Sequence, residues 1–458
     1  MFRFVKRTLT TTQIIAAGFL IAIIIGTFLL CLPISSQTRT WTPVIDAMFM
    51  ATTSLCVTGL VTVTTVEYWS LFGQVVILFL IQFGGLGVVT FTTTMLLVLR
   101  KRITLKERIL IQDAYNLDTL RGLVRLTKRI LKATLIVEGI GAAFLAIQFI
   151  QDYGFFSGIW KSIFISVSAM CNAGIDLIGA YSLMPYQGNV LINFTIMTLI
   201  VLGGIGFPVW WDVVGQVKEL RQKKFKSSPR KFFSKLTLHT KIVITVTFIL
   251  IFGGMILIFL LEYTNPNTIG KMPLWEKLMA SLFQSVTTRT AGFLTIPQEC
   301  LKDTSAFLSI ILMFIGGSPS GTAGGVKTVT IAMMILSAYC IMKGKEDTEV
   351  FHRKIPSTIV RKGLAVVMVS LGVLISSTIL LSITEKAPFL DVFFETTSAL
   401  ATVGLSRGLT GNLTFLGKVI IITTMYIGRI GPISLALFFN SSKKTTHRGL
   451  PEGKIMVG

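Results

Sequence analysis

The sequence predicts an all-α integral membrane protein, with eight transmembrane helices arranged as four repeats in one chain. Three observations predict this fold: an apolar composition, a series of long segments with almost no charge, and a glycine-ended motif that occurs four times. Of the 458 residues, 52% are hydrophobic and 14% are charged. A typical soluble domain carries about 25% charged residues. Lipid must therefore be the solvent for most of this chain.

Eight segments have the length and composition of membrane-spanning helices. Four contain no charged residue, namely 8–38, 68–99, 242–261 and 363–384. The other four carry one or two charges, and are 130–151 with Glu138, 190–213 with Asp212, 307–342 with Lys327 and 415–439 with Arg429. A spanning helix needs about 20 apolar residues. The basic N-terminus resembles a signal peptide, but its apolar segment is too long and lacks a small-residue cleavage site, so we expect a helix there.

The basic residues orient these helices. Of the 43 Lys and Arg, 32 lie in the N-terminus, the C-terminus and the segments 100–132, 216–241 and 343–362, against 8 in the opposite loops. Cytoplasmic loops are enriched in Lys and Arg, which predicts cytoplasmic termini. The same bias accounts for the net charge of +22 without nucleic acid as a partner. The segment 99–132 has helical periodicity and could instead dock a cytosolic protein or anionic lipid headgroups of the bilayer.

A short motif between the spans occurs four times on the predicted outer side. Each copy opens with an aromatic residue in a Ser/Thr-containing apolar run and ends on a glycine after small residues, as in FMATTSLCVTGL (49–60), FISVSAMCNAGI (164–175), LFQSVTTRTAGF (282–293) and FETTSALATVGL (394–405). The closing glycines, Gly59, Gly174, Gly292 and Gly404, are separated by 115, 118 and 112 residues. Near-equal spacing is typical of a repeated structural unit.

A second glycine motif follows in the next helix of each unit: GGLG at 84–87, GGIG at 203–206, GGSP at 316–319 and GRIG at 428–431. Each unit is therefore predicted as helix, half-helix, glycine loop and helix, in one orientation. The second motifs could line a pore or could only let helices pack closely, as small residues do. The predicted domains are repeat 1 at 1–99, repeat 2 at 100–215, repeat 3 at 216–342, repeat 4 at 343–440 and a cytoplasmic tail at 441–458.

Four non-helical loops at membrane depth are chemically suited to a cation. Such backbone is tolerated only inside protein or beside water, and loops around one axis would direct rings of carbonyl oxygens at its centre. These oxygens can replace the hydration shell of an ion. The prediction is therefore a helix–pore-loop–helix repeat around a pseudo-four-fold pore for monovalent cations. The filter is assigned to Val57, Thr58, Gly59, Asn172, Ala173, Gly174, Thr290, Ala291, Gly292, Thr402, Val403 and Gly404.

Three basic residues, Arg289, Lys327 and Arg429, lie in the predicted membrane interior. Arg429 is about ten residues from either end of its helix, where a charge costs about 2.5–3.5 kcal/mol. It could stand beside the pore, or pair with Glu138 or Asp212. Arg289 lies three residues before Gly292, at the position of Cys56 and Cys171, and is expected to brace the loop rather than contact the ion. Lys327 stands at the end of the interruption in the third unit and could tether that segment.

That interruption reads GGSPSGTAGGVK, and so many glycines with a proline cannot hold a helix. We expect an intramembrane loop over 316–326, acting either as a gate below the filter or as a static kink. The gating-loop residues are Gly316, Gly317, Ser318, Pro319, Ser320, Gly321, Thr322, Ala323, Gly324, Gly325 and Lys327.

Other functional classes fit poorly. Five Cys without a CxxC pair and three dispersed His predict no zinc site, and no nucleophile or metal constellation indicates an enzyme. No GxGxxG or P-loop motif predicts a nucleotide site in this chain. A transporter for an organic solute would require inverted repeats around a midplane site, whereas these units all run in one direction.

The four units, their single glycines, the GGSPSGTAGGVK break and the late GRIGP helix closely resemble the Trk/Ktr/HKT superfamily over essentially the whole chain, and within it the bacterial Ktr-type ion-translocating subunit. The resemblance implies K⁺ uptake across the bacterial plasma membrane, stimulated by Na⁺, by a homodimer with one pore per subunit. It also implies a cytosolic ring of nucleotide-binding RCK-type regulatory subunits, so that this chain itself needs no cofactor.

Residue by residue, the resemblance gives Gly59, Gly174, Gly292 and Gly404 the filter role, with K⁺ held at filter carbonyls, and makes Arg429 the pore arginine. Plant relatives with serine in place of the first filter glycine are sodium-selective, so Gly59 favours K⁺. The loop's Ser-Pro-Ser differs from forms richer in Ala and Ser. The alternative function is a sodium-permeable or weakly selective cation transporter of the same fold.

Overall fold

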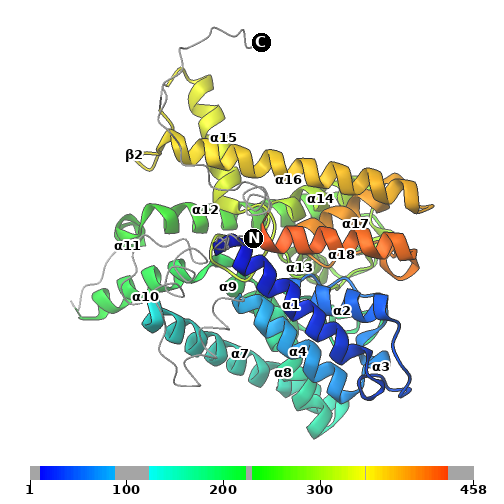
Figure 1. Cartoon of the computed structure of the whole chain (residues 1–458). Helices are drawn as coiled ribbons and strands as arrows, with labels where there is room; N and C mark the ends of the chain where they lie inside the picture. The colour runs from blue at the N-terminus through cyan, green and yellow to red at the C-terminus, as the bar shows by residue number, and fades with distance from the viewer. Residues whose placement is uncertain (1–10, 88–122, 223–228, 346, 432–458) are drawn as a thin grey trace, which may run out of the picture.

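The computed structural model describes residues 11–87, 123–222, 229–345 and 347–431, and in these ranges its regular secondary structure consists of helices and one two-stranded hairpin. Four of its helices are long and apolar enough to cross a membrane. They coincide with four of the predicted spans and are α1 (Thr11–Cys31), α7 (Leu123–Tyr153), α12 (Leu238–Glu262) and α16 (Ser357–Thr384). Figure 1 shows α1 and α16 running roughly side by side with α18, while α10, α11 and β2 gather at the end opposite α3.

Each long helix packs against a shorter helix that follows it in the chain. The short helices are α2 (Val44–Cys56), α8 (Phe155–Cys171), α13 (Leu274–Thr287) and α17 (Phe389–Ala401). Three of them begin directly after proline and carry an acid in the first turn, where the helix dipole favours negative charge. Each of the four buries one phenylalanine completely: Phe49, Phe164, Phe283 and Phe394. These are aromatics of the repeated motif.

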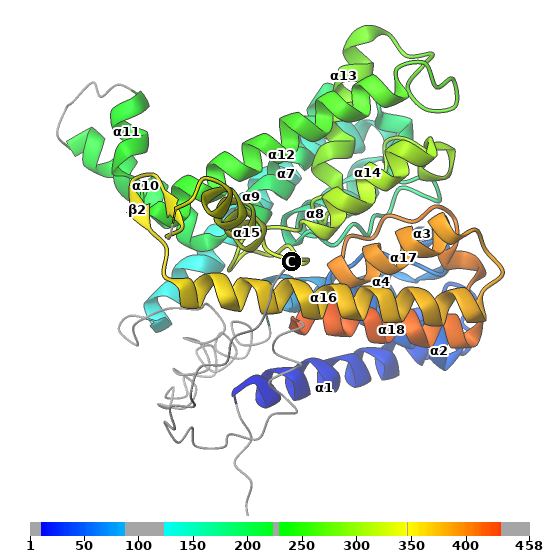
Figure 2. The same ribbon diagram turned by 90° about the horizontal axis from the view of Figure 1, so that it is seen from above.

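The second helices of the four units close the structure into a ring. They are α4 (Leu71–Leu86), α9 (Val190–Ile205), α14 (Asp303–Phe314) and α18 (Phe415–Ile430). Each packs against the short helix of the next unit, so that α4 contacts α8, α9 contacts α13 and α14 contacts α17. The last helix, α18, contacts α2 of the first unit. Viewed from above, α16, α17 and α18 lie beside α1 and α2 (Figure 2).

One predicted span needs correction. We expected 190–213 to cross as an uninterrupted helix, but α9 ends at Ile205 and α10 (Phe207–Gln222) leaves at an angle of 100°. Gly206 makes this turn with a φ of +94°, which an L side chain rarely adopts. The sequence contains a signal for this bend that we did not use. Pro208 lies two residues after Gly206, and proline is favoured in the first turn of a helix.

The third unit is interrupted where the sequence predicts. Between α14 and α15 (Thr328–Met342) the chain has no regular secondary structure apart from a bridge between Ile315 and Val326. The remaining described elements are α3 (Thr65–Tyr68), α11 (Pro229–Lys235), β1 (Glu349–Val350), β2 (Arg353–Lys354), η1 (Pro33–Ser35), η2 (Met184–Tyr186), η3 (Gln298–Cys300) and η4 (Thr410–Asn412). The C-terminal parts of the predicted spans 68–99 and 415–439, most of the basic segment 99–132 and the tail 441–458 lie outside the described residues.

Candidate functional site

The four glycine loops share one backbone conformation. In each, the residue two positions before the glycine is in the left-handed region, and the glycine itself has a positive φ. The φ values of the preceding residues are 56° for Val57, 61° for Asn172, 63° for Thr290 and 52° for Thr402. Those of the glycines are 98° for Gly59, 65° for Gly174, 81° for Gly292 and 92° for Gly404. The left-handed residue directly caps the short helix in units one, two and four, whereas α13 of unit three ends at Thr287 and has Thr288 as its cap, before Thr290.

The four glycines meet one another in cyclic order. A Cβ atom added to Gly59 would lie 2.5 Å from the carbonyl oxygen of Ala173 in the next loop. The same distance separates an added Cβ on Gly174 from Ala291 O, and one on Gly292 from Val403 O. An added Cβ on Gly404 would collide with Thr58 O, which returns to the first loop. Only glycine fits at these positions, and carbonyl groups of all four loops lie around one centre.

A cavity of about 370 Å³ lies directly beside this ring. All four glycines line it, and the acidic residues Asp176 and Glu299 are part of its wall. Asp176 is partly buried and accepts hydrogen bonds from Ser182 Oγ and from the Ile178 N–H at 2.9 Å. The cavity is therefore a polar entrance to the ring with negative charge at its side.

Hydroxyl and carbonyl groups of the short helices hold the loops. Thr58 N donates to Thr53 O at 2.8 Å, and Gly59 N donates to Thr53 Oγ1 at 3.0 Å. The fourth unit repeats both bonds with Ser398 as the acceptor. We predicted no role for these groups, although a Ser or Thr stands six residues before the glycine in units one, two and four. The hydroxyls of Thr53, Ser168 and Ser398 accept in this way, whereas in the third unit the Thr287 hydroxyl donates to Phe293 O at 2.7 Å.

The interrupted segment of the third unit lies against the glycine loops. Thr322 Oγ1 is 3.1 Å from Met170 O and 3.0 Å from Asn172 Oδ1, both in the second unit. Gly324 N donates to Thr290 Oγ1 of the third unit at 3.2 Å. An added Cβ on Gly324 would also collide with the Thr402 hydroxyl of the fourth unit. The loop is thus in contact with three of the four glycine loops.

The same segment is joined to the bend between α9 and α10. Ser318 N donates to Gly204 O at 2.9 Å and Thr322 N donates to Gly203 O at 3.1 Å, which satisfies carbonyls at the end of α9. Within the loop, Lys327 Nζ donates to Ala323 O at 2.7 Å. The predicted tether by Lys327 is therefore a bond to the loop's own backbone.

Arg429 holds the loop from the fourth unit. Its Nη1 donates to Thr322 O at 2.7 Å, and its Nη2 donates to Gly84 O in α4. The carboxylates weighed as alternative partners are engaged elsewhere, with Glu138 near Gln82 and Asp212 accepting from Thr237. The guanidinium therefore links the loop to the first unit instead of making either ion pair.

The second glycine motifs serve close packing in three units. An added Cβ on Gly84 would collide with Leu55 O, one on Gly203 with Met170 O and one on Gly428 with Leu400 O. Each of these carbonyls lies four residues before the loop glycine of the same unit. The geometry supports the packing alternative for these positions, since the helix approaches the end of the short helix without room for a side chain.

Arg289 differs from the expected brace. Its side chain is buried and Nη1 has no hydrogen-bond partner among the described residues. Its backbone carbonyl accepts from Asn172 Nδ2 at 3.4 Å and so joins the second and third loops. The backbone carbonyl of Arg289 therefore braces the loops, which we expected its guanidinium group to do. Cys56 and Cys171, at the equivalent positions, are buried free thiols.

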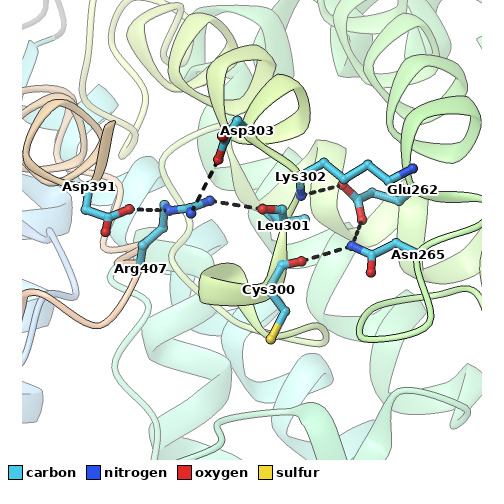
Figure 3. A network of polar contacts seen from close by, with 8 residues as sticks. All are labelled: Glu262, Asn265, Cys300, Leu301, Lys302, Asp303, Asp391 and Arg407. Carbon is cyan, nitrogen blue, oxygen red and sulfur yellow. Dashed lines mark hydrogen bonds and ion pairs between the residues drawn. The ribbon is translucent and has the colours of Figure 1, made fainter. Parts of the chain in front are cut away.

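On the entrance side, polar contacts join the third and fourth units (Figure 3). Arg407 Nε donates to Asp391 Oδ1 at 2.6 Å and Arg407 Nη1 donates to Leu301 O at 3.2 Å. Nearby, the buried Glu262 carboxylate accepts from Lys302 N at 3.0 Å and from Asn265 Nδ2 at 2.7 Å. These contacts fix the chain on either side of the third and fourth glycine loops.

Comparison with known proteins places these features in a family. A family model named TrkH and described as "Cation transport protein" matches residues 4–448. The chain is 40% identical to the Ktr system potassium uptake protein B of Bacillus subtilis, over 98% of this chain and 97% of that one. It is 38% identical to the potassium/sodium uptake protein NtpJ of Enterococcus hirae, over 99% and 98% of the two chains.

A solved structure is similar in fold. The potassium transporter TrkH from Vibrio parahaemolyticus superposes with a TM-score of 0.73 over 96% of this chain and 86% of that one, at 17% identity. At that identity the likeness concerns the fold alone. It agrees with the predicted helical membrane architecture.

Proposed function

The chain belongs to the TrkH family of cation transport proteins, and on this basis we propose that it takes up K⁺ through a pore at the ring of four glycine loops. The family is one of transporters, so the chain is a multi-pass membrane transporter and not an enzyme. The observation that carries the proposal is the cyclic contact of Gly59, Gly174, Gly292 and Gly404 with the carbonyl group of the neighbouring loop. The Bacillus subtilis relative, which is named for potassium uptake, supports the choice of ion.

Carbonyl oxygens around one centre supply what a dehydrated monovalent cation needs. The filter is formed by the glycines and the two residues before each of them. Their backbone is held by the short helices and by left-handed residues, so the oxygens are fixed before the ion arrives. Asp176 and Glu299 at the entrance favour a cation over an anion. With cytoplasmic termini, an inside-negative potential contributes about 2.3 kcal/mol per 100 mV to each entering charge.

The loop over 316–327 serves as the gate of this pore. Its contacts with three filter loops put polypeptide directly at the filter, and Arg429 keeps it there through Thr322 O. Ions pass when the loop is displaced. Deletion of 317–324 is expected to raise K⁺ flux in proteoliposomes, and unchanged or lower flux in a folded variant would show that the segment is a static kink.

Regulation is proposed from the resemblance to Ktr-type subunits. The chain forms a homodimer, is stimulated by Na⁺ and is controlled by a cytosolic ring of RCK-type subunits that binds the nucleotide. The basic loops on the cytoplasmic side suit such a partner. Co-purification of the full chain with that ring, and a change of flux on adding nucleotide, would test this part.

The alternative is a sodium-permeable or weakly selective transporter. The Enterococcus relative, which is named for both potassium and sodium uptake, supports this alternative. Growth rescue of a bacterium without its own K⁺ uptake, at limiting K⁺, tests the main proposal. The native chain, expressed with its regulatory partner, should restore growth. If added Na⁺ abolished the growth rescue, the result would favour the alternative. An expressed chain that did not restore growth would contradict K⁺ uptake.

A further inference from the structure

The gating loop contacts the filter at one repeat position, two residues before the glycine. This position is held by Val57, Asn172, Thr290 and Thr402. Three of the four are polar, and the loop touches those three. The apolar member, Val57, packs near Gly84 of α4 instead. The side chain at this position is therefore polar where the gating loop contacts it and apolar where the loop does not.

The second and third units carry hydrogen bonds at this position. Thr322 has one hydroxyl proton, which it shares between Met170 O and Asn172 Oδ1. The Asn172 amide continues to Arg289 O in the third unit. Beside it, the Thr290 hydroxyl accepts from Gly324 N. Two neighbouring filter loops are thereby connected through the gating loop as well as to each other.

These bonds fall on residues whose backbone needs support. Asn172 and Thr290 have φ values of 61° and 63°, in the left-handed region that L residues other than glycine adopt at a cost. The cost is greater for a β-branched residue such as Thr290. Such conformations persist when the surrounding structure holds them. The gating loop supplies part of that hold, because it binds the side chains of both residues.

We propose that Thr322 and the Gly324 amide are structural members of the selectivity filter, and that Asn172 and Thr290 are positioning residues through which the loop sets its geometry. Displacement of the loop breaks these bonds and loosens the second and third filter loops. The preference for K⁺ over Na⁺ therefore depends on the state of the gate. This inference rests on the proposed filter and gate. A loop that acted only as a plug would change the rate of transport and leave the preference unaltered.

The test uses isosteric substitutions that remove one hydroxyl each. Thr322→Val removes the donor to Asn172, and Thr290→Val removes the acceptor of Gly324 N without changing β-branching. The full-length chain is reconstituted in proteoliposomes, and K⁺ and Na⁺ fluxes are measured under equal gradients. Each valine variant is expected to lower the K⁺-over-Na⁺ flux ratio about fivefold, the effect of one hydrogen bond. Thr322→Ser and Thr290→Ser retain the hydroxyl and should restore the native ratio.

Thr423→Val is the matched control. Thr423 is exposed on α18, and among the described residues its hydroxyl bonds only to Val419 O of its own helix, so the ratio and rate should equal those of the native chain. Unfolding temperature and size-exclusion profile establish that each variant is folded. The two sites lie in different segments, so if one valine variant does not fold the other decides the result.

The outcomes separate the inference from the function on which it rests. A lower ratio in a folded valine variant, restored by serine, supports it. A native ratio in the folded valine variants, whatever their rate, overturns it, and so does a serine variant that shifts the ratio as much as valine. Failure of the native chain to conduct K⁺ contradicts the proposed function itself.

Discussion

Lys418 Nζ donates to Asp46 Oδ1 at 2.6 Å, so that α18 of the last unit is ion-paired with α2 of the first. The two residues are 372 positions apart in the chain. Their side chains are 17% and 20% exposed, which limits screening by water. The pair closes the ring of units at the place where the chain itself does not connect them.

Removal of this pair should destabilise the ring. Lys418→Met leaves the Asp46 carboxylate without its charged partner, and we expect a loss of about 1.5–3 kcal/mol, the range for hydrogen bonds to charged groups. The apparent unfolding temperature in detergent reports the change. The double variant Asp46→Asn with Lys418→Met should recover part of the loss, because no unpaired charge remains.

Lys345→Met provides the comparison for that experiment. Lys345 pairs with Glu349 at 2.7 Å, but both side chains are about half exposed, and such pairs contribute about 0–1 kcal/mol. If Lys418→Met shifted the unfolding temperature no more than Lys345→Met, the pair would have no special role in closing the ring.

Gly59→Ser should impair selection for K⁺. The new Cβ would lie 2.5 Å from Ala173 O, at a φ of +98°. Strain of about 1–3 kcal/mol at this backbone should lower the K⁺-over-Na⁺ uptake ratio about tenfold. Competition between the two ions in proteoliposomes measures the ratio. Gly372→Ala in α16, where no atom lies within 4 Å of the added Cβ, should leave it unchanged.

Equal ratios in the native chain and Gly59→Ser would mean that Gly59 is not part of the filter. A lower ratio in Gly372→Ala would instead point to a general effect of replacing glycine.

Arg429→Gln should release the gate. The variant cannot reproduce the two bonds to Thr322 O and Gly84 O that hold the loop. Hydrogen bonds from charged groups contribute about 1.5–3 kcal/mol each, so the open fraction should rise about tenfold or more. K⁺ flux without the regulatory partner measures it, with the exposed Arg361→Gln as control. Lower flux in folded Arg429→Gln would contradict a holding role.

Asp176 gives the entrance a pH dependence. Burial raises the pKa of its carboxyl group above the ordinary value, against the lowering effect of hydrogen bonds from Ser182 and Ile178 and of the Lys161 charge. Acidification should therefore neutralise Asp176 before ordinary surface aspartates, and K⁺ uptake should fall over that interval because the entrance loses a negative charge. Asp176→Asn should remove this part of the pH profile of flux.

The effect of Asp176 protonation on the stability of the fold distinguishes a loss of K⁺ flux at the entrance from a loss caused by unfolding. A carboxyl whose pKa is raised by folding binds its proton more tightly in the folded state, so protonation of Asp176 favours the folded protein. Flux should decline while this group causes no loss of unfolding temperature. A pH profile that was identical in the native chain and Asp176→Asn would exclude Asp176 as the titrating group.

The local signals in the sequence were sufficient for much of the fold. The spacing of Gly59, Gly174, Gly292 and Gly404 predicted four similar segments, and the glycine-rich run after Ile315 predicted the break in the third unit. Both depend on backbone conformations that glycine permits, which are visible residue by residue. The bend at Gly206 was missed because the apolar composition continues through it, and length and hydropathy outweighed the proline that follows.

The contacts between units could not be predicted in this way. Neither Thr322 with Asn172 nor Asp46 with Lys418 has a local pattern, because each joins segments that meet only after the ring has closed. Arg429 was recognisable as a buried charge, but its partners are two backbone carbonyls, which no sequence distinguishes from any others. Interpretation of single residues therefore identified important positions more readily than their partners.

The central claim is that the four glycine loops bind the permeating ion together. Anomalous diffraction from crystals of the full-length chain grown in Rb⁺ or Tl⁺, which replace K⁺, tests it most directly. We predict anomalous density on the axis between Gly59, Gly174, Gly292 and Gly404. Density that lay only elsewhere in the protein, or that was absent from the axis in crystals of a chain competent for uptake, would contradict it.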